Sequence, residues 1–79
     1  MMVLIVIEHS PKQRFLVKLH TEALIREVTK LIERRRHSQA MVTALSKGRF
    51  AKEIDQNELP NVKADLILSK DSVSWDLMK

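Results

Sequence analysis

The sequence predicts a small α+β domain that begins with two strands and a helix. Three observations indicate this fold class. Residues 3–7 are continuously apolar and rich in β-branched side chains, which is typical of a strand buried on both faces. Residues 14–20 alternate between polar and apolar side chains, which indicates a second strand. Residues 21–37 then carry apolar side chains at helical spacing.

The boundary between the second strand and the helix depends on how the segment around Pro11 is interpreted. Ser10 and Pro11 fit the start of a helix, and they fit the turn of a hairpin equally well. A single helix over residues 11–36 would carry apolar stripes on two opposite sides, which one core cannot bury. A break at Thr21 removes this conflict, because residues 14–20 then form a strand and only one apolar stripe remains on the helix. Thr21 becomes the N-cap of that helix, which ends near His37.

The second half of the chain predicts shorter elements. Residues 40–45 predict a strand, residues 50–59 a short helix or irregular crossing, and residues 62–69 the last strand. Residues 71–79 predict a C-terminal tail in which Val73, Trp75 and Leu77 alternate with polar residues. We therefore expect one domain over residues 1–70. The alternative fold, which keeps a helix start at Ser10, is an α/β unit of order βαβαβ with a parallel sheet.

The composition excludes several classes of chemistry. The chain has 79 residues, no cysteine and a single glycine, Gly48. The absence of cysteine excludes a disulfide scaffold and metal sites with thiolate ligands. The single glycine excludes the glycine-rich loops that bind phosphates and the Gly-x-Ser-x-Gly turn of many hydrolases. The apolar run at the N-terminus is too short to span a membrane. We expect an intracellular, cytoplasmic domain.

The predicted order ββαβ, a crossing and a final strand resembles the ubiquitin-like β-grasp fold over residues 2–70. The resemblance rests on the hairpin 3–20, the helix 21–37, the strand near 40–45, and residues 54–59 leading into residues 64–68. Conjugating members of that family end in a Gly-Gly tail, whereas this chain ends Leu77-Met78-Lys79. The resemblance therefore implies a non-conjugating ubiquitin-like domain that acts by binding other proteins.

A second resemblance is to the N-terminal region of the Kurly family of ciliary dynein-assembly proteins. It rests on Met2-Val3-Leu4, on Phe15-Leu16 and on the step from Leu45 to Gly48. These are common residue types, so the predicted function depends on the first resemblance and on the residues themselves.

One face of the predicted hairpin is a candidate binding site. With residues 10–13 as the loop, His9 pairs with Arg14, and Leu4 and Val6 face the helix. Aliphatic side chains then lie on the opposite face, which a β-grasp sheet leaves open. Such a face usually binds a partner or is covered. We expect the tail, a partner protein or a second copy of the chain to cover it. The candidate residues are Val3, Ile5, Ile7, Leu16 and Trp75.

A basic patch on the predicted helix is the second candidate site. Its residues are Arg26, Lys30, Arg34, Arg35 and Arg36, and residues 26–36 as a whole carry most of the net charge of +4. Positive charge at a helix C-terminus favours helix termination, and a basic surface also attracts acidic proteins or nucleic acid. Aromatic side chains for base stacking are few, so protein binding is the leading function. Binding of RNA or DNA by a small basic regulator is the alternative.

We predict no catalytic residue, no metal site and no cofactor. In the predicted hairpin His9 and His20 are roughly 20 Å apart, too far to share a metal. His37 has no second ligand at helical spacing, and zinc needs three or four converging ligands. The helix glutamates Glu22 and Glu27 have basic neighbours rather than a second carboxylate. The predicted partner is thus another protein, with an acidic surface or as a second copy, and no membrane.

Overall fold

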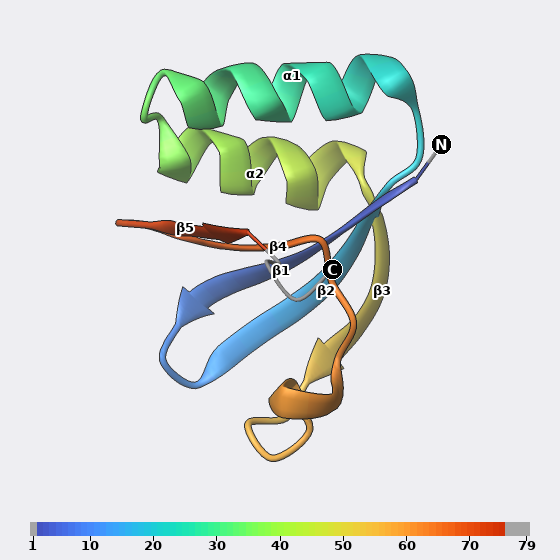
Figure 1. The fold of residues 1–79 in the computed structure, drawn as a ribbon, viewed down its shortest axis with the longest axis vertical. Coiled ribbons are helices and arrows are strands. Elements are labelled where there is room, and N and C mark those ends of the chain that lie inside the picture. The colour runs from blue at the N-terminus through green and yellow to red at the C-terminus, as the bar shows by residue number, and fades with distance from the viewer. Residues whose placement is uncertain (1, 76–79) are drawn as a thin grey trace.

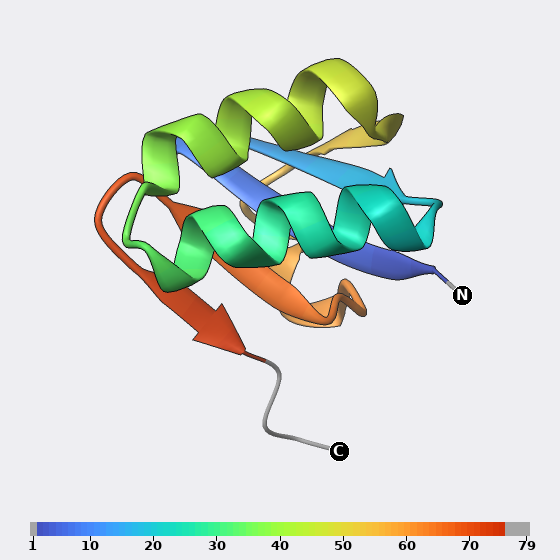
Figure 2. The same cartoon turned by 90° about the horizontal axis from the view of Figure 1, so that it is seen from above.

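A computed structural model describes residues 2–75 of the chain (Figure 1). Its elements are β1 (Val3–Ser10), β2 (Gln13–Leu19), α1 (Glu22–Glu33), α2 (His37–Lys47), β3 (Arg49–Ile54), a 3-10 helix (Leu59–Asn61), β4 (Leu66–Ser69) and β5 (Val73–Trp75). The strands form one sheet of order β3-β2-β1-β4-β5, in which β1 and β4 are parallel and the other neighbours antiparallel. Both helices lie on one face of the sheet (Figure 2). The predicted α+β class is confirmed.

The β1–β2 hairpin exists as predicted, which contradicts the alternative βαβαβ unit, but its register differs by one residue. Val3 lies opposite Leu19, and Glu8, not His9, lies opposite Arg14. A bulge between Glu8 and the turn accommodates the extra residue. The predicted pairing of His9 with Arg14 is therefore wrong by one position, since the length of the loop does not reveal the bulge.

That one-residue shift exchanges the two faces of β1. Ile5 and Ile7, predicted for the open face, lie in the core beneath the helices. Val6, predicted for the core face, is buried on the opposite side of the sheet, outside that core cluster. The side chains of a strand alternate with a period of two, so a slip of one residue moves each of them to the other face.

Helix α1 begins where the sequence predicts. The Oγ1 atom of Thr21 accepts a hydrogen bond of 3.1 Å from the backbone N–H of Leu24. This bond satisfies one of the N–H groups that have no partner at a helix start. The helix ends at Glu33, before the predicted end at His37.

The chain leaves α1 through a Schellman turn. Arg35 has a left-handed backbone, with φ of 59°. The N–H of Arg36 donates to the Leu31 carbonyl at 2.8 Å, and that of Arg35 donates to the Ile32 carbonyl at 2.9 Å. These bonds satisfy carbonyl groups at the helix end. The short turn leads directly into a second helix.

Helix α2 replaces the strand predicted for residues 40–45, and that prediction is wrong. Ala40, Met41 and Ala44 are its buried residues, and their spacing forms one helical stripe against the core. A short apolar run has no periodicity that distinguishes a buried strand from one side of a helix. The tight turn at residues 34–36 lets α2 fold back beside α1 (Figure 2).

The C-terminal half contains two strands that the sequence does not predict as such. Residues 49–54 form β3 at the edge of the sheet, in the region predicted to be a short helix or irregular crossing. Residues 73–75 of the predicted tail form β5, so this part of the tail belongs to the sheet. Strand β4 begins at Leu66, later than the predicted start at residue 62. Leu77 lies outside the described residues.

The main core lies between the helices and the sheet. It contains Ile5, Ile7, Val17 and Leu19 of the hairpin, Leu24, Val28 and Ile32 of α1, Ala40, Met41 and Ala44 of α2, and Leu66 and Leu68 of β4. The connection from β3 to β4 runs on the side of the sheet away from the helices (Figure 1). None of the helices within residues 2–75 is long and apolar enough to cross a membrane.

Candidate functional site

The residues predicted to form a binding face on the sheet do not lie together. Ile5 and Ile7 have no exposed surface, and Val3 packs against the same core. Only Leu16 lies on the face away from the helices, where it is half-buried. Trp75 is 50% exposed but lies in the edge strand β5, which β4 separates from β1. The predicted patch therefore depends on the wrong hairpin register.

Trp75 does not cover the far face of the sheet. It lies opposite Leu66, a core residue. Val73, two residues earlier in the same strand, packs against the core. Residues directly opposite in a ladder share a face, so Trp75 lies on the helix-facing side. Over its described part the predicted tail thus extends the sheet and does not fold beneath it.

The five residues of the basic patch are all exposed. No ion pair within residues 2–75 involves any of them. Glu22 and Glu33 share the exposed side of α1 with Arg26 and Lys30. The net positive charge is therefore concentrated in the turn between the helices, at residues 34–36.

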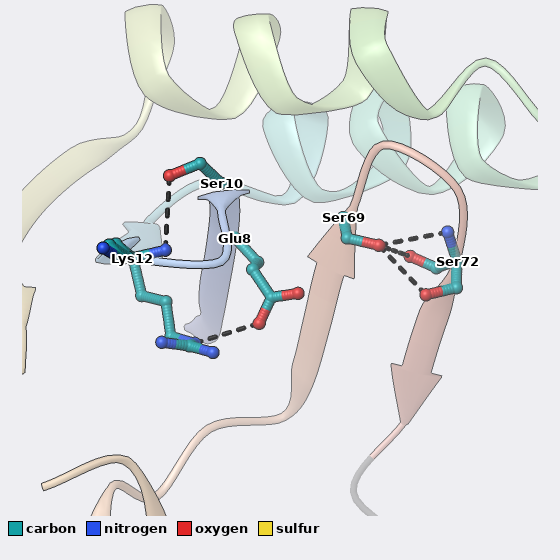
Figure 3. Close-up of polar contacts among 6 residues, drawn as sticks. Glu8, Ser10, Lys12, Ser69 and Ser72 are labelled. Carbon is teal, nitrogen blue, oxygen red and sulfur yellow. Dashed lines mark hydrogen bonds and ion pairs between the residues drawn. The ribbon is translucent and has the colours of Figure 1, made fainter. Parts of the chain in front are cut away.

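A cluster of hydroxyl groups lies at the end of the sheet where the two hairpin turns meet (Figure 3). The Ser69 hydroxyl lies 3.0 Å from that of Ser72 and 3.2 Å from the Ser72 backbone nitrogen. In the neighbouring turn Ser10 Oγ accepts from the Lys12 N–H at 3.3 Å. These bonds hold the turns in place, and among the described residues no base activates either Ser69 or Ser72 as a nucleophile.

Two ion pairs within residues 2–75 fasten the hairpin and the crossing. Arg14 Nε donates to Glu8 Oε2 at 2.9 Å across the hairpin. Lys52 Nζ bonds Glu58 Oε2 at 2.7 Å, and the Asp55 N–H donates to the other carboxylate oxygen at 2.8 Å. The Lys52 ammonium and the Asp55 N–H lower the pKa of Glu58, because both stabilise its ionised form. This pair fastens the start of the crossing to β3.

The described residues bring no metal-binding group together. No three His, Asp or Glu side chains within residues 2–75 converge on one point. His9 and His20 are exposed, and His37 is half-buried at the start of α2. An open depression at the end of β3 is lined by one basic side chain, Lys12, and three acidic ones, Glu53, Asp55 and Glu58. Glu58 already forms an ion pair with Lys52.

The edge strand β3 has the most distinctive surface in the described part of the chain. Five of its six residues, Arg49 to Glu53, are exposed. It pairs with β2 on one side, and no described strand pairs with its other side. An edge strand of this length presents unpaired backbone N–H and C=O groups to solvent.

The helix-facing side of β3 carries the aromatic side chain of Phe50, with Glu53 further along the strand. Phe50 lies opposite the core residue Val17 and is 57% exposed, and its ring is tilted against that of Phe15 with 6.2 Å between the centroids. On α2, Val42 and Leu45 are also exposed. Lys47 of that helix pairs with Glu27 of α1 at 3.1 Å. At 100° per residue, Leu45 is therefore on the flank away from α1, and Val42 is on the outer side of the helix, away from the sheet.

The far side of β3 is basic. Arg49 lies opposite Lys18 and Lys52 opposite Leu16. Lys18 lies between two core residues of β2, so it points away from the helices, and its partner Arg49 does too. A bulge at Ala51 also turns Lys52 to this side.

We name these residues the β3 surface: Leu45 and Phe50 on the apolar side, and Lys18, Arg49 and Lys52 on the basic side. The sequence does not predict this surface, since β3 has no apolar alternation and the pairing of Lys18 with Arg49 follows only from the register. The adjacency of Phe50 and Arg49 after the single glycine is the one local indication of an amphipathic strand.

Comparison of the chain with protein-family models, with curated proteins and with solved structures found no match.

Proposed function

We propose that this chain is a non-catalytic protein-binding module of the ubiquitin-like β-grasp type, and that a partner docks on the β3 surface. The single observation that carries the proposal is the exposed edge strand with an apolar side at Phe50 and a basic side at Arg49. A monomeric protein normally protects such an edge, because it is a template for pairing with another chain. The parallel β1–β4 pair beneath the helices supports the β-grasp assignment.

The proposed site replaces the sheet face predicted from the sequence. Of that face only Leu16 adjoins the new surface, because it lies opposite Lys52. The partner class remains the predicted one, another protein with acidic groups, since three cations lie along the far side of β3.

A selection experiment tests this function. The chain is immobilised, peptides are selected from a random display library, and their binding sites are mapped by backbone amide shifts. We expect the selected peptides to shift residues 49–54. A Phe50→Ser substitution should lower the affinity of the chain for these peptides about tenfold, as expected for an aromatic contact residue at an interface. Trp75→Ser, which removes a similarly exposed aromatic from the other edge, is the matched control. Selected peptides that map to α1, or that bind the Phe50→Ser variant normally, contradict the proposal.

Nucleic-acid binding through the basic patch is the second candidate function. The observation that favours it is that all five cations of the patch are exposed and free of ion pairs within residues 2–75. The described aromatic residues all belong to strands, and α1 and the turn that follows it contain none, so these segments supply no side chain for base stacking. Binding of RNA or DNA should fall steeply as salt rises. Affinity that is lost in Arg34→Gln and Arg36→Gln variants but kept in Phe50→Ser would support this candidate.

A further inference from the structure

We propose that the partner binds β3 as an added strand in which acidic and apolar residues alternate. This inference rests on the binding surface proposed above and names the chemistry of its partner. The edge of β3 offers backbone hydrogen bonds, and its two sides offer different side-chain environments. In strand addition the backbone contributes affinity, and alternate side chains contribute specificity.

The two environments lie on opposite faces of the same strand. Phe50 faces the helix side, next to the aromatic ring of Phe15. Arg49 and Lys52 face the other side, next to Lys18. A strand placed beside β3 turns successive side chains to these two faces in turn. Apolar residues of the added strand would therefore meet Phe50, and acidic residues would meet the cations.

The cations on the far side lack sufficient acidic partners within the chain. Lys18 and Arg49 are directly opposite each other, and like charges in that position destabilise a sheet. Neither forms an ion pair within residues 2–75, whereas Lys52 bonds Glu58 at 2.7 Å. A carboxylate on the neighbouring strand would lie between two cations, which satisfies both and removes their repulsion.

A second copy of the chain fits this edge less well. Two β3 strands paired about a twofold axis normal to the sheet keep their helix-facing sides together. Arg49, Lys52 and Lys18 of both copies would then lie on one face, with Glu53 on the other. Charge therefore favours an acidic partner over self-association, and the net charge of +4 acts in the same direction.

Synthetic peptides test the proposed alternation. The isotope-labelled chain is titrated with a peptide of alternating glutamate and valine, and backbone amide shifts and dissociation constants are measured. Two control peptides have the same length: one alternates lysine and valine, and the other has the same composition as the test peptide in separate glutamate and valine blocks. We expect the alternating acidic peptide to shift residues 49–54 and to bind at least about tenfold more tightly than either control.

Two further arms test the geometry. Alternate backbone N-methylation of the acidic peptide, in either of the two possible frames, should abolish binding in one frame only, because only every second N–H of an added strand faces β3. In the protein, Arg49→Glu should weaken binding about tenfold or more. Lys63→Glu makes the same change in net charge at an exposed position in the crossing, and it should leave binding within about twofold.

Each result decides the inference. Equal affinity of the alternating and block peptides would mean attraction by charge alone, and equal affinity of the two methylated peptides would rule out strand addition. Concentration-dependent shifts of residues 49–54 in the chain alone would assign the edge to a second copy. In the display selection above, peptides that map to the β3 surface without acidic alternation would leave the binding function standing and overturn only this inference.

Discussion

Lys18 and Arg49 lie directly opposite each other in neighbouring antiparallel strands, and neither has an acidic partner within residues 2–75. A cross-strand pair of like charges destabilises a sheet, and an opposite pair stabilises it. We predict that Arg49→Glu raises the free energy of unfolding by roughly 0.5–1 kcal/mol. Urea denaturation measures the change, and Lys63→Glu, which has no such partner, should change it little. An Arg49→Glu variant less stable than Lys63→Glu would contradict the prediction.

This pair connects stability with function. Arg49→Glu is predicted to stabilise the isolated domain and to weaken the binding of an acidic partner. If Arg49 lowers the stability of the domain, its presence at this position is explained by binding and not by folding.

The hairpin register has a consequence that mutagenesis measures directly. Ile5 is fully buried in the core, whereas Leu16 is half-buried on the far face. We predict that Ile5→Ala lowers the free energy of unfolding by about 2–5 kcal/mol, as expected for a large side chain deleted from a packed core. Leu16→Ala should lower it by about 1 kcal/mol, because part of its surface is already in water. Chemical denaturation of both variants gives the comparison, and the reverse order would favour the register without a bulge.

Local patterns sufficed for the first half of the fold. The two strands at the N-terminus and the cap at Thr21 each depend on residues close together in the sequence, and the structure confirms them. The predictions that failed concern places where the local pattern fits two structures, namely the turn after Glu8 and the short apolar run at residues 40–45. A bulge after Glu8 is invisible in the sequence pattern, yet it exchanges the faces of Ile5 and Val6.

The candidate site was less accessible to sequence analysis than the fold. The basic patch is exposed as predicted, although only Arg26 and Lys30 lie in α1 and residues 34–36 form the turn that follows it. The β3 surface instead combines Lys18 from β2, Leu45 from α2 and Arg49 from β3. Such a surface exists only once the chain folds, and an exposed edge strand has no apolar alternation that would reveal it.

The pair of Lys52 and Glu58 makes the crossing sensitive to acid. The pKa of Glu58 lies below its ordinary value of 4.5, chiefly because Lys52 bonds the carboxylate and also because the Asp55 N–H does. A lowered pKa contributes stability that is complete above pH 4.5 and is lost as the pH falls through the folded-state pKa. We predict that the difference in stability between the wild type and Glu58→Gln shrinks as the pH falls below that value.

Carbon-detected NMR of the Glu58 carboxyl group checks the cause of this effect. The titration midpoint should rise in Lys52→Met, which removes the ammonium group and retains the aliphatic stem. It should remain unchanged in Lys63→Met, a control at an exposed position of the same crossing. An unchanged midpoint in Lys52→Met would show that this ion pair does not stabilise the crossing in solution.

The single glycine is required by packing at the junction of α2 and β3. Gly48 has φ of −76°, a backbone that any residue adopts. A Cβ atom there would lie 2.6 Å from Val17 Cγ1 and would also overlap the carbonyl oxygen of Ala44, which the Gly48 N–H bonds at 2.8 Å. We predict that Gly48→Ala lowers the free energy of unfolding by about 1–3 kcal/mol, the usual effect of overpacking.

The neighbouring contacts separate the two causes of that loss. Val17→Ala removes the side-chain overlap but leaves the Ala44 carbonyl in place. In the background of Val17→Ala, the Gly48→Ala substitution should therefore cost less stability than in the wild type, but still some. Thermal and urea denaturation of the four proteins in the cycle measure this coupling energy. Fully additive effects would assign the loss to the Ala44 carbonyl alone. A Gly48→Ala protein as stable as the wild type would mean that α2 shifts away from β2 at little cost in free energy. In that case the junction would not hold the start of β3, and with it Arg49 and Phe50, in a fixed position.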